Sequence, residues 1–483
     1  MIPMTVKYIE HPDTNLNGNP LSEAIQVQLN QQSLYSAITH RANIQHNFWE
    51  LPEIYQQTQL RQLTEVHIPV PQTWNLYNKM MSLILFGYVR RNPFSKDMRM
   101  FNARLAECMR NGKMFNPGPQ SGIGPTTAPA SLVFGDSGSG KTKGIRGVLG
   151  QIPQVITHTS YKGEHFKKDQ LTWVSFDLPP NGSPKAMTAS FFRSVDNALG
   201  TDYTTEWSNN EKYSVERLMA AMQHVASIHC LGLVHIDELQ FMLGYKKIKD
   251  SPSLQTLETL FNKIGVPVIQ SSTQQGVEIF ETLKEGDHRL GHDITTVRRM
   301  LNDREFKFST HTSDSVYFND LFDALFPAGI IRGGLTEIAS FKQTFQRLSC
   351  GLPAIMNRLA LLHHETIMTL LQKPDNAAHD YVTFDVGLLE RVFKNQFSLI
   401  APALVELRNG NRAVYEKSIR NEETKNTTYS DKEVRKEDKK INQLAKTPAV
   451  LKVDADRPLE PHTGTSLSLD DFKIGIEVSN AKN

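Results

Sequence analysis

Cysteine is scarce in this sequence, and so are long apolar runs. Its 483 residues include only Cys108, Cys230 and Cys350. Three widely spaced thiols exclude a disulfide framework and a zinc site of paired Cys-x-x-Cys ligands, and they favour a reducing compartment. No apolar run approaches the roughly 20 residues that cross a bilayer, and the first residues lack the basic-then-apolar order of a signal peptide. These absences predict a cytoplasmic protein without a membrane partner.

A strong excess of charge of either sign is also missing. The 53 Lys and Arg residues nearly balance the 51 Asp and Glu residues, which leaves a formal net charge of +2. A wholly basic coating protein is excluded, so any contact with nucleic acid must come from a local cluster of cations. One such cluster follows an apolar, helix-like stretch that begins at Met80. It comprises Arg90, Arg91, Lys96, Arg99, Arg104, Arg110 and Lys113.

Composition divides the chain into four predicted parts. Residues 1–75 show no sustained period, a loop rich in Gly and Pro covers 116–130, and helical spacing replaces the strand pattern after Phe308. The polar composition after Asn411 buries too little surface to offset the entropy of ordering. The expected parts are an N-terminal arm or adaptor domain at 1–115, an α/β core at 116–310, a helical lid at 311–410 and a flexible tail with one docking segment at 411–483.

Short apolar runs alternate with amphipathic helical stretches in the middle of the chain. This alternation is typical of parallel strands whose two faces are both covered by helices. The sequence therefore predicts a doubly wound α/β fold. The five expected strands are 131–136, 154–159, 171–178, 231–237 and 266–273.

A phosphate-binding loop follows the first expected strand. Residues 135–142 match the pattern G-x-x-x-x-G-K-[ST] in full. In such a loop the glycines let backbone amides close around a β-phosphate, Lys141 neutralises phosphate oxygens, and Thr142 offers its hydroxyl to Mg²⁺. The pattern predicts ATP and Mg²⁺ as ligands, and the alternative is a Gly-rich turn that matches by chance. The predicted nucleotide-binding residues are Gly135, Asp136, Ser137, Gly138, Ser139, Gly140, Lys141 and Thr142.

Two acids, Asp237 and Glu238, stand at the end of the expected strand 231–237. A carboxylate at the end of a buried strand beside a phosphate loop holds the water shell of Mg²⁺, and its neighbour can polarise the attacking water. We therefore expect Asp237 at the metal and Glu238 as the base of ATP hydrolysis. The alternative is that the two acids cap the next helix.

The last expected strand ends in polar side chains. Thr273 is the favoured contact for the γ-phosphate or the attacking water, with Ser271 and Ser272 as close competitors. Hydroxyl groups at a strand end can bind either group directly. The alternative is that this Ser and Thr cluster forms the N-cap of a following helix.

Several arginines are candidates for contacts with the nucleotide. Arg298, Arg299 and Arg304 stand where a ring ATPase presents an arginine to the γ-phosphate of the neighbouring subunit, and such a finger contributes about 10³ to 10⁵ in rate. Arg298 is the first choice and Arg299 the second. Arg358, in the helical region, is a candidate for the nucleotide of its own subunit. The alternatives are a solvated helix face and, for Arg358, a surface salt bridge.

Together these motifs resemble the AAA+ ATPase fold, and more narrowly the TnsC-type regulators of bacterial transposons with a heteromeric transposase. The narrower resemblance rests on GYVRRNP at 87–93 and NGSPK in the stretch 181–200, and it covers about residues 80–410. It implies a protein that binds ATP, assembles into a ring or helical filament on duplex DNA, receives a signal from a target-selection protein of the TnsD or TniQ type, and recruits the transposase subunits. The polar strand end 270–272 and the tail depart from the family pattern.

The resemblance also implies non-specific contacts with duplex DNA. In the family, the loop that corresponds to the one holding Lys185 faces a central channel and touches the phosphate backbone, and Thr204 is a weaker candidate from the same region. Phosphate contacts carry no base information, which suits a protein that accepts any target sequence. The alternative for Lys185 is a solvated turn lysine. The competing functions are a STAND-like signalling ATPase and a relative of clamp loaders or helicase loaders.

Overall fold

The computed structural model divides into two compact units, Met1–Glu422 and Glu423–Asn483. The second unit lies outside the described residues, and so do Arg298, Arg299, Arg304 and most of the predicted tail. The described residues are 4–115, 128–180, 183–208, 213–242, 257, 260–261, 264–274, 276–277, 305–334, 337–372 and 381–419.

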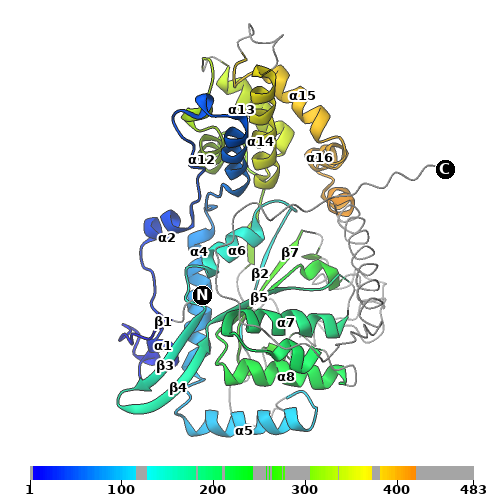
Figure 1. The fold of residues 1–483 in the computed structure, drawn as a ribbon. Helices are drawn as coiled ribbons and strands as arrows, with labels where there is room; N and C mark the ends of the chain where they lie inside the picture. The colour runs from blue at the N-terminus through cyan, green and yellow to red at the C-terminus, as the bar shows by residue number, and fades with distance from the viewer. Residues whose placement is uncertain are drawn as a thin grey trace, which may run out of the picture. The chain divides into compact units, whose positions relative to one another are not determined.

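A five-stranded parallel sheet forms the centre of the α/β core (Figure 1). Its strand order is β5-β6-β7-β2-β8, so the strand that precedes the phosphate loop lies between the last two strands of the sequence. Nearly all residues of β2, β6 and β7 are buried, as expected for strands covered on both faces. The predicted α/β fold class is confirmed. The strands are β2 (Ala130–Gly135), β5 (Trp173–Asp177), β6 (Leu233–Asp237), β7 (Val268–Thr273) and β8 (Glu305–Phe308).

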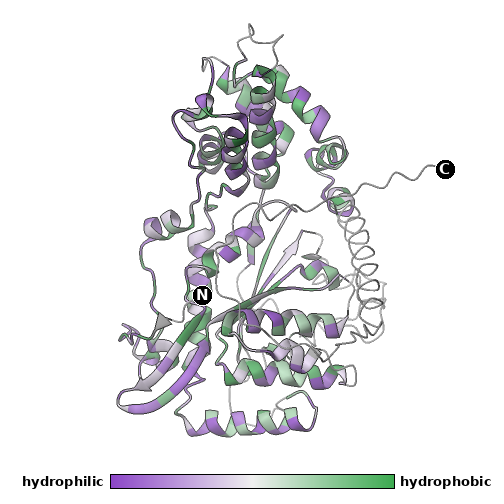
Figure 2. Ribbon diagram, viewed as in Figure 1, coloured by the Kyte–Doolittle hydropathy of each residue, from purple (hydrophilic) through white to green (hydrophobic). Residues whose placement is uncertain are grey.

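The expected strand at 154–159 exists, but its place in the central sheet is wrong. It belongs to a separate three-stranded sheet with the order β1-β3-β4, in which β3 and β4 form an antiparallel hairpin. Lys162 and Gly163 close this hairpin with φ values of 48° and 87°, the conformation that a two-residue hairpin turn requires. Figure 2 shows hydrophilic residues along the hairpin, which explains why it lies outside the covered sheet. The strands are β1 (Met4–Thr5), β3 (Val155–Tyr161) and β4 (Glu164–Leu171).

The fifth strand of the central sheet, β8, is absent from the sequence prediction. It has four residues, and it pairs only with β2 at the edge of the sheet. Glu305 and Lys307 are exposed, whereas Phe306 and Phe308 are buried. A short alternating segment with two charges does not have the continuous apolar pattern expected of a covered parallel strand, so the pattern gave no signal.

Helices cover both faces of the central sheet (Figure 1). Adjacent residues Leu132 and Val133 of β2 point to opposite faces and belong to two separate apolar clusters. Helices α4 and α6 pack on the side of Val133, whereas α7 and α8 pack on the side of Leu132, with α5 against α8. These helices are α4 (Thr73–Val89), α5 (Lys96–Arg110), α6 (Lys141–Leu149), α7 (Pro184–Leu199) and α8 (Val215–Ile228).

The GYVRRNP segment at 87–93 anchors α4 to the start of β6. The Tyr88 hydroxyl donates to the Cys230 carbonyl at 2.8 Å, and Arg91 Nη1 donates to the Leu231 carbonyl at 2.6 Å. Both side chains are buried. A Cβ atom at Gly87 would lie 2.9 Å from Arg91 Nη2 and 3.1 Å from the Pro267 ring, so glycine leaves room for both side chains. Arg91 therefore supports the fold and does not belong to the exposed cationic cluster.

Five helices that follow the sheet pack around an aromatic core, as the helical spacing predicts. The rings of Phe322 and Phe326 stack with 4.4 Å between centroids, and Phe345 packs edge-on against both. Residues 412–419, which the sequence assigns to the flexible tail, form a further helix that buries Tyr415. The helices are α12 (Val316–Leu325), α13 (Ile338–Ser349), α14 (Pro353–Leu371), α15 (Val386–Gln396) and α16 (Ala401–Arg408), with the 3-10 helix η9 (Ala328–Ile330) between α12 and α13.

The part of the predicted N-terminal arm that precedes α4 consists mainly of short helices packed on other parts of the chain. Helix α3 and the 3-10 helix η3 lie against α14, and Asn357 of α14 donates to the Val66 carbonyl at 2.9 Å. Phe48, Leu60 and Leu63 are fully buried. Elements this short have no long hydrophobic period, which explains the irregular sequence pattern. They are α1 (Pro20–Glu23), α2 (Gln31–Ile38), α3 (Glu53–Arg61), η1 (Thr14–Leu16), η2 (Phe48–Glu50) and η3 (Gln62–Glu65).

The described residues contain neither a membrane span nor a self-contained metal cluster. None of their helices combines the length and the hydropathy that crossing a bilayer demands. No group of three or more His, Cys, Asp or Glu side chains within the same ranges is arranged to hold a metal ion. Cys108, Cys230 and Cys350 are free thiols, as the cysteine spacing predicts.

Candidate active site

The phosphate loop lies at the C-terminal edge of the central sheet, directly after β2. Strand β2 pairs with β7 on one side and β8 on the other, whereas the next core strand along the chain, β5, lies at the far edge. The strand order therefore reverses beside this loop, and open parallel sheets bind their ligands at such a point. Asp177, Asp237 and Thr273 end β5, β6 and β7 at the same edge.

Two glycines in the left-handed conformation shape the loop. Gly138 and Gly140 have φ values of 79° and 87°, which other residues rarely adopt. A Cβ atom at Gly140 would meet nothing within 4 Å, so the backbone is open on that side. Helix α6 begins immediately afterwards at Lys141, and the amides of its first turn have no partners within the helix. The amides of a glycine-rich loop beside a helix N-terminus form an anion-binding site.

The Lys141 ammonium lies inside this loop. Its Nζ atom donates to the carbonyl oxygens of Gly135 at 2.8 Å and Asp136 at 2.9 Å, and the residue is only 8% exposed. Burial lowers the pKa of Lys141, and four surrounding carboxylates, with Glu416 the strongest, oppose that effect. A buried ammonium needs an anionic partner, which a phosphate oxygen in the loop supplies.

Thr142 and Asp237 bring two oxygen ligands together. The Thr142 hydroxyl donates to Asp237 Oδ2 at 2.6 Å, and the Ser271 hydroxyl donates to Asp237 Oδ1. Burial raises the pKa of Asp237, but the hydrogen bonds from Ser271, Thr142 and the Glu238 amide favour the carboxylate, and the pKa lies below its ordinary value. Asp237 is therefore an anion at neutral pH. An anionic carboxylate beside a hydroxyl is the oxygen-only ligand set that Mg²⁺ prefers.

Glu238 adopts the left-handed conformation, with a φ of 60°, which is strained for a residue with a side chain. Its carboxylate accepts a hydrogen bond from Gln240 Nε2. Gln240 Oε1 in turn accepts from the Thr273 amide at 3.2 Å and the Ser272 hydroxyl at 3.3 Å. No side-chain bond from Glu238 caps the 3-10 helix η5 (Leu239–Phe241), so the capping alternative does not hold for Glu238. Gln240 connects the candidate base with the end of β7.

The donors of this site fit a nucleoside triphosphate and Mg²⁺. The loop amides and Lys141 suit phosphate oxygens, whereas Thr142 and Asp237 suit the cation. The Ser139 hydroxyl is buried and has no hydrogen-bond partner among the described residues. Such an orphaned polar group beside open amides is expected where a ligand supplies the missing partner.

Arg358 contacts the helical region instead of the phosphate loop, although its helix starts beside that loop. The Ala354 amide, in the first turn of α14, donates to the Gly138 carbonyl at 3.2 Å. One turn later, Arg358 donates to the Gln396 carbonyl at 3.2 Å and lies 4.6 Å from the centre of the Phe397 ring. The structure thus brings α14 to the loop through its backbone. A nucleotide contact by Arg358 stays a prediction.

The two predicted DNA contacts lie in different surroundings. Lys185 is exposed in the first turn of α7, which Ser183 caps. Thr204 is half-buried, and its amide and hydroxyl both donate to Asp196 Oδ2, at 2.8 and 2.6 Å. The Thr204 hydroxyl is therefore engaged within its own subunit beside a carboxylate, which repels phosphate. Both DNA contacts stay predictions.

Four residues beside the site have no counterpart in the sequence predictions. Asp177 faces Asp237 in the strand register and forms a 2.8 Å ion pair with Arg146. An acid at the end of an expected strand is a sequence feature that indicates a place in the site. His235 interrupts an apolar strand, which indicates a functional position less strongly. No sequence pattern marks Gln240 or Glu416, since only the fold brings their side chains to the site.

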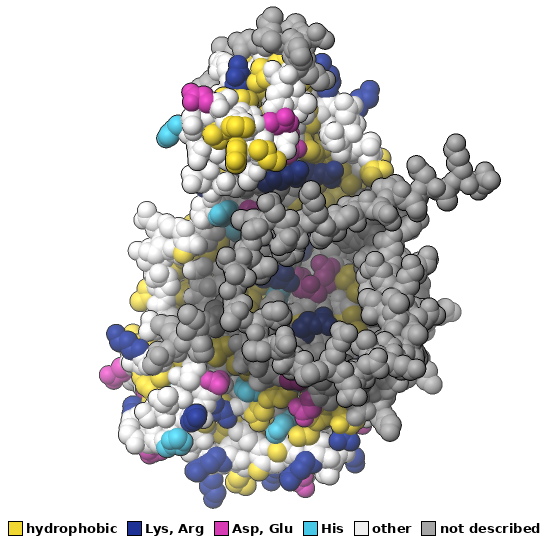
Figure 3. Space-filling model, viewed as in Figure 1, with side chains coloured by type: hydrophobic (Ala, Val, Ile, Leu, Met, Phe, Trp, Pro, Cys, Tyr) yellow, Lys and Arg dark blue, Asp and Glu magenta, His cyan; other side chains and the backbone are white. Residues whose placement is uncertain are grey.

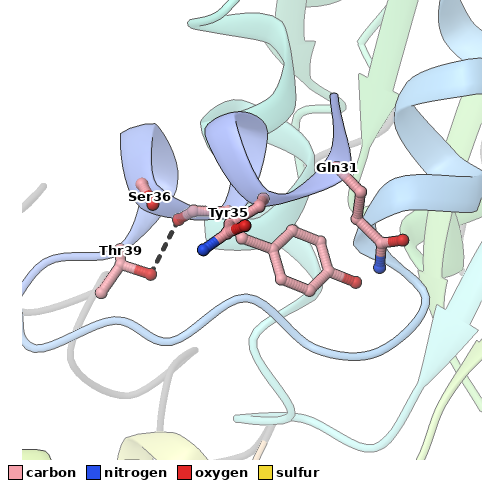
Figure 4. Close-up of a pocket in the computed structure, with 5 residues that line it drawn as sticks. Gln31, Tyr35, Ser36 and Thr39 are labelled. Atoms are coloured by element: carbon pink, nitrogen blue, oxygen red, sulfur yellow. Dashed lines mark hydrogen bonds between the residues drawn. The ribbon is translucent and has the colours of Figure 1, made fainter. Parts of the chain in front are cut away.

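A shallow pocket on the N-terminal part of the chain is separate from this site (Figure 4). The Thr39 hydroxyl donates to the Tyr35 carbonyl at 2.8 Å, as the dashed line shows, and the Tyr35 hydroxyl donates to the Pro71 carbonyl at 3.1 Å. The lining contains no charged side chain, so it offers no chemistry to a nucleotide. The lining residues are Gln31, Gln32, Tyr35, Ser36 and Thr39.

Residues 126–279 match the AAA domain family. This segment contains the phosphate loop, both acids at the end of β6 and the polar end of β7. The match and the geometry support an AAA+ P-loop ATPase. The comparison with curated proteins found no match for this chain.

Two of the solved structures that match illustrate a distant likeness to this chain. A Walker-type ATPase of Pyrococcus abyssi is 14% identical over 64% of this chain and 75% of its own, with a TM-score of 0.34. The RuvB Holliday junction branch migration motor of Thermotoga maritima is 10% identical over 65% of this chain and 76% of its own, with a TM-score of 0.29. Scores this low carry no argument, so the likeness to AAA domains rests on the family match over residues 126–279 and on the described site.

Proposed function

We propose that this chain is an ATP-dependent, DNA-binding regulator of DNA transposition. It assembles on target duplex DNA, links a target-selection protein to the transposase subunits, and hydrolyses ATP. The observation that carries the ATPase part is the hydrogen bond between Thr142 and Asp237, because it joins the phosphate loop to the strand that ends beside Glu238. The transposition part is supported by the resemblance of GYVRRNP and NGSPK to TnsC-type regulators.

The residues of the site divide the work of hydrolysis among them. Lys141 and the loop amides bind the phosphates, while Thr142 and Asp237 hold Mg²⁺. Bound Mg²⁺ supplies positive charge against the phosphate oxygens. Glu238, oriented by Gln240, accepts a proton from the attacking water. An arginine from a neighbouring subunit, Arg298 or Arg299, completes the site in the assembled state.

A row of exposed cations on α5 supports the DNA-binding part. At 100° per residue, the exposed side chains of Lys96, Arg99 and Arg110 lie opposite the buried face of Met98, Phe101 and Leu105, and Arg104 lies at its flank. The exposed acids of this helix are Asp97 and Glu107. Figure 3 shows Lys and Arg side chains along the lower edge of the molecule, where Figure 1 draws α5. With a net charge of only +2, such a local row is where contacts with phosphates are expected.

Co-sedimentation with duplex DNA tests this function. The protein should sediment with DNA of any sequence in ATP or a slowly hydrolysed analogue, and it should stay in the supernatant in ADP. A signalling ATPase of the STAND type would ignore DNA in all three nucleotides. A loader-type ATPase would bind DNA without changing transposition, so a transposition assay with and without this chain separates the two.

A further inference from the structure

A series of buried hydrogen bonds crosses three adjacent strands and ends at Asp237. His235 Nδ1 lies 2.8 Å from the Ser175 hydroxyl of β5, and His235 Nε2 lies 2.8 Å from the Ser271 hydroxyl of β7. Ser271 donates to Asp237 Oδ1, and Thr142 donates to Oδ2. His235 and Ser271 have no exposed surface. The metal-site carboxylate is thus held from two sides.

The carboxylate fixes the direction of every bond in this series. Asp237 only accepts, so Ser271 uses its single hydroxyl proton on Asp237 and must itself accept from His235 Nε2–H. In a neutral imidazole, Nδ1 then carries no proton and accepts from the Ser175 hydroxyl. A single tautomer of His235 therefore gives every hydrogen bond in the series from Ser175 through Ser271 to Asp237 one donor and one acceptor.

We propose that His235 and Ser271 are positioning residues for Asp237. They hold one carboxylate oxygen, so that the other faces Thr142 and the cation. A covered strand normally carries apolar residues here, and a buried imidazole is costly unless both of its nitrogens are bonded. The polar end of β7, which departs from the TnsC-type pattern, is thus the partner of the histidine in β6. This inference rests on Asp237 as a ligand of Mg²⁺.

The test measures how Mg²⁺ changes the affinity for ADP, which requires no hydrolysis. In Ser271→Ala and His235→Leu, the Mg²⁺ concentration that produces half of the change in ADP affinity should rise about 10- to 100-fold. This is the usual loss of metal affinity when a hydrogen-bond partner of a metal ligand is removed. ADP binding in EDTA should stay unchanged. His235→Gln, which keeps an amide donor and acceptor, should restore part of the Mg²⁺ response.

The matched control is Ser131→Ala, which removes a buried hydroxyl from β2 that has no hydrogen-bond partner among the described residues. It should leave the Mg²⁺ response as it is. A folded Ser271→Ala variant with the normal Mg²⁺ response would overturn the positioning role. If the unaltered protein showed no Mg²⁺ response, the metal site itself would be refuted.

A second, independent observation concerns the helix at 412–419. The Glu416 carboxylate accepts a 2.8 Å hydrogen bond from the Ser137 amide, and the Tyr415 hydroxyl donates to the Ser137 carbonyl at 2.9 Å. Tyr415 is 2% exposed and Glu416 is 4% exposed. Consecutive residues of one helix thus bind both backbone groups of one residue in the phosphate loop.

This contact places a carboxylate in the anion-binding site. The loop amides attract anions, and one N–H group serves either the carboxylate or a phosphate oxygen at full strength. Among the carboxylates that oppose the lowering of the Lys141 pKa, Glu416 has the largest effect, so its charge also acts on the ammonium. Arg412 Nε lies 3.5 Å from Asp136 Oδ1 and holds the same helix to the loop.

We infer that the helix at 412–419 is an autoinhibitory latch on the phosphate loop. A bound triphosphate takes the Ser137 amide and displaces Glu416, so nucleotide binding must first release the helix. The apparent affinity is then reduced by the fraction of molecules in which the latch is closed. This inference rests on the loop as the nucleotide site of the proposed ATPase.

Glu416→Gln tests the latch because it removes the charge and keeps the shape. Affinity for a slowly hydrolysed ATP analogue should become about tenfold tighter, as a charge-assisted hydrogen bond is replaced by a weaker neutral one. Tyr415→Phe should act in the same direction and less strongly. Glu390→Gln is the matched control, because it removes the same charge from α15, where Glu390 pairs with Arg347 at 2.6 Å.

Limited trypsin digestion gives a second readout that does not depend on affinity. Cleavage after Arg412 and Lys417 should be slow without nucleotide and faster with the ATP analogue. Unchanged or weaker nucleotide affinity in Glu416→Gln would overturn the latch, and so would cleavage that ignores nucleotide. The Lys141→Ala variant separates the latch from the nucleotide site. If this variant loses all nucleotide binding, the loop is the nucleotide site, and either of the two contrary results above then argues against the latch alone.

Discussion

The hydroxyl of Thr142 donates a 2.6 Å hydrogen bond to Asp237, a residue 95 positions further along the chain. Thr142 is the second residue of α6, the helix after β2, and Asp237 ends β6, yet β7 lies between these two strands in the sheet. The candidate metal site therefore spans three strands at one edge of the sheet. This relationship connects the loop that binds phosphate to the acids that act on water.

Replacing Lys141 by alanine should abolish nucleotide binding. The change removes the only side-chain cation whose hydrogen bonds lie inside the described phosphate loop, which leaves the charge of a triphosphate without a partner. Titration calorimetry with ATP and ADP measures this directly. An unchanged affinity would show that the loop is not the nucleotide site.

Replacing Glu238 by glutamine should separate binding from hydrolysis. The amide still meets Gln240, but it cannot take a proton from water, so the hydrolysis rate should fall at least about 100-fold while ATP affinity persists. Assemblies on DNA should live longer for the same reason. Phosphate release at the normal rate in this variant would assign the base to another residue.

Arg298 and Arg299 are predicted to act on the nucleotide of a neighbouring subunit. Each alanine variant should bind ATP, yet it should neither hydrolyse ATP nor oligomerise. Mixing such a variant with Lys141→Ala subunits should restore part of the ATPase activity, because each partner supplies what the other lacks. Mixtures without any recovery would place the arginines within their own subunit or outside the mechanism.

The lid should lose stability in mild acid. Burial lowers the pKa of His363 to about 4 and of His364 to about 3, from an ordinary value of 6.5. Between pH 6.5 and about 4 the unfolded chain binds protons that the folded chain excludes, so the free energy of unfolding falls as the pH falls.

Urea unfolding at pH 7.5 and pH 5 measures this effect, and His364→Gln should lose less stability over the interval because one titrating group is gone. Equal unfolding midpoints at both pH values would contradict the burial of these neutral imidazoles.

Local sequence predicted the parts of the site that lie within one segment. The pattern at 135–142 alone predicts the phosphate loop, the start of the helix after it and the cation Lys141. Four expected strands joined the central sheet because a continuous apolar run is required wherever both faces are covered. The strand at 154–159 does not join the central sheet, because the two-residue turn at Lys162 and Gly163 folds it into a hairpin with β4.

The remaining contacts depend on side chains that meet only after folding. Ser137 and Glu416 are 279 positions apart, and no local pattern marks a glutamate as the partner of a loop amide. His235 and Ser271 meet because β6 and β7 are neighbours, a fact that requires the strand order. Gln240 reaches Glu238 only because Glu238 adopts a left-handed backbone conformation.

The central claim is that ATP builds a DNA-binding surface from subunits that are nearly neutral overall. Binding should then be non-specific and steeply salt-dependent, with a slope of log affinity against log salt of about −0.9 for each phosphate contacted. Lys185→Ala should weaken binding to all sequences alike and make the slope shallower, without changing ATP affinity. An unaltered slope in this variant would remove Lys185 from the interface.

Fluorescence anisotropy on two unrelated duplexes, across a salt series in an ATP analogue and in ADP, tests this claim most directly. Both duplexes should bind tightly in the analogue and weakly in ADP, and both affinities should fall together as the salt concentration rises. Tight binding in ADP, or a strong preference for one duplex by this protein alone, would contradict the claim.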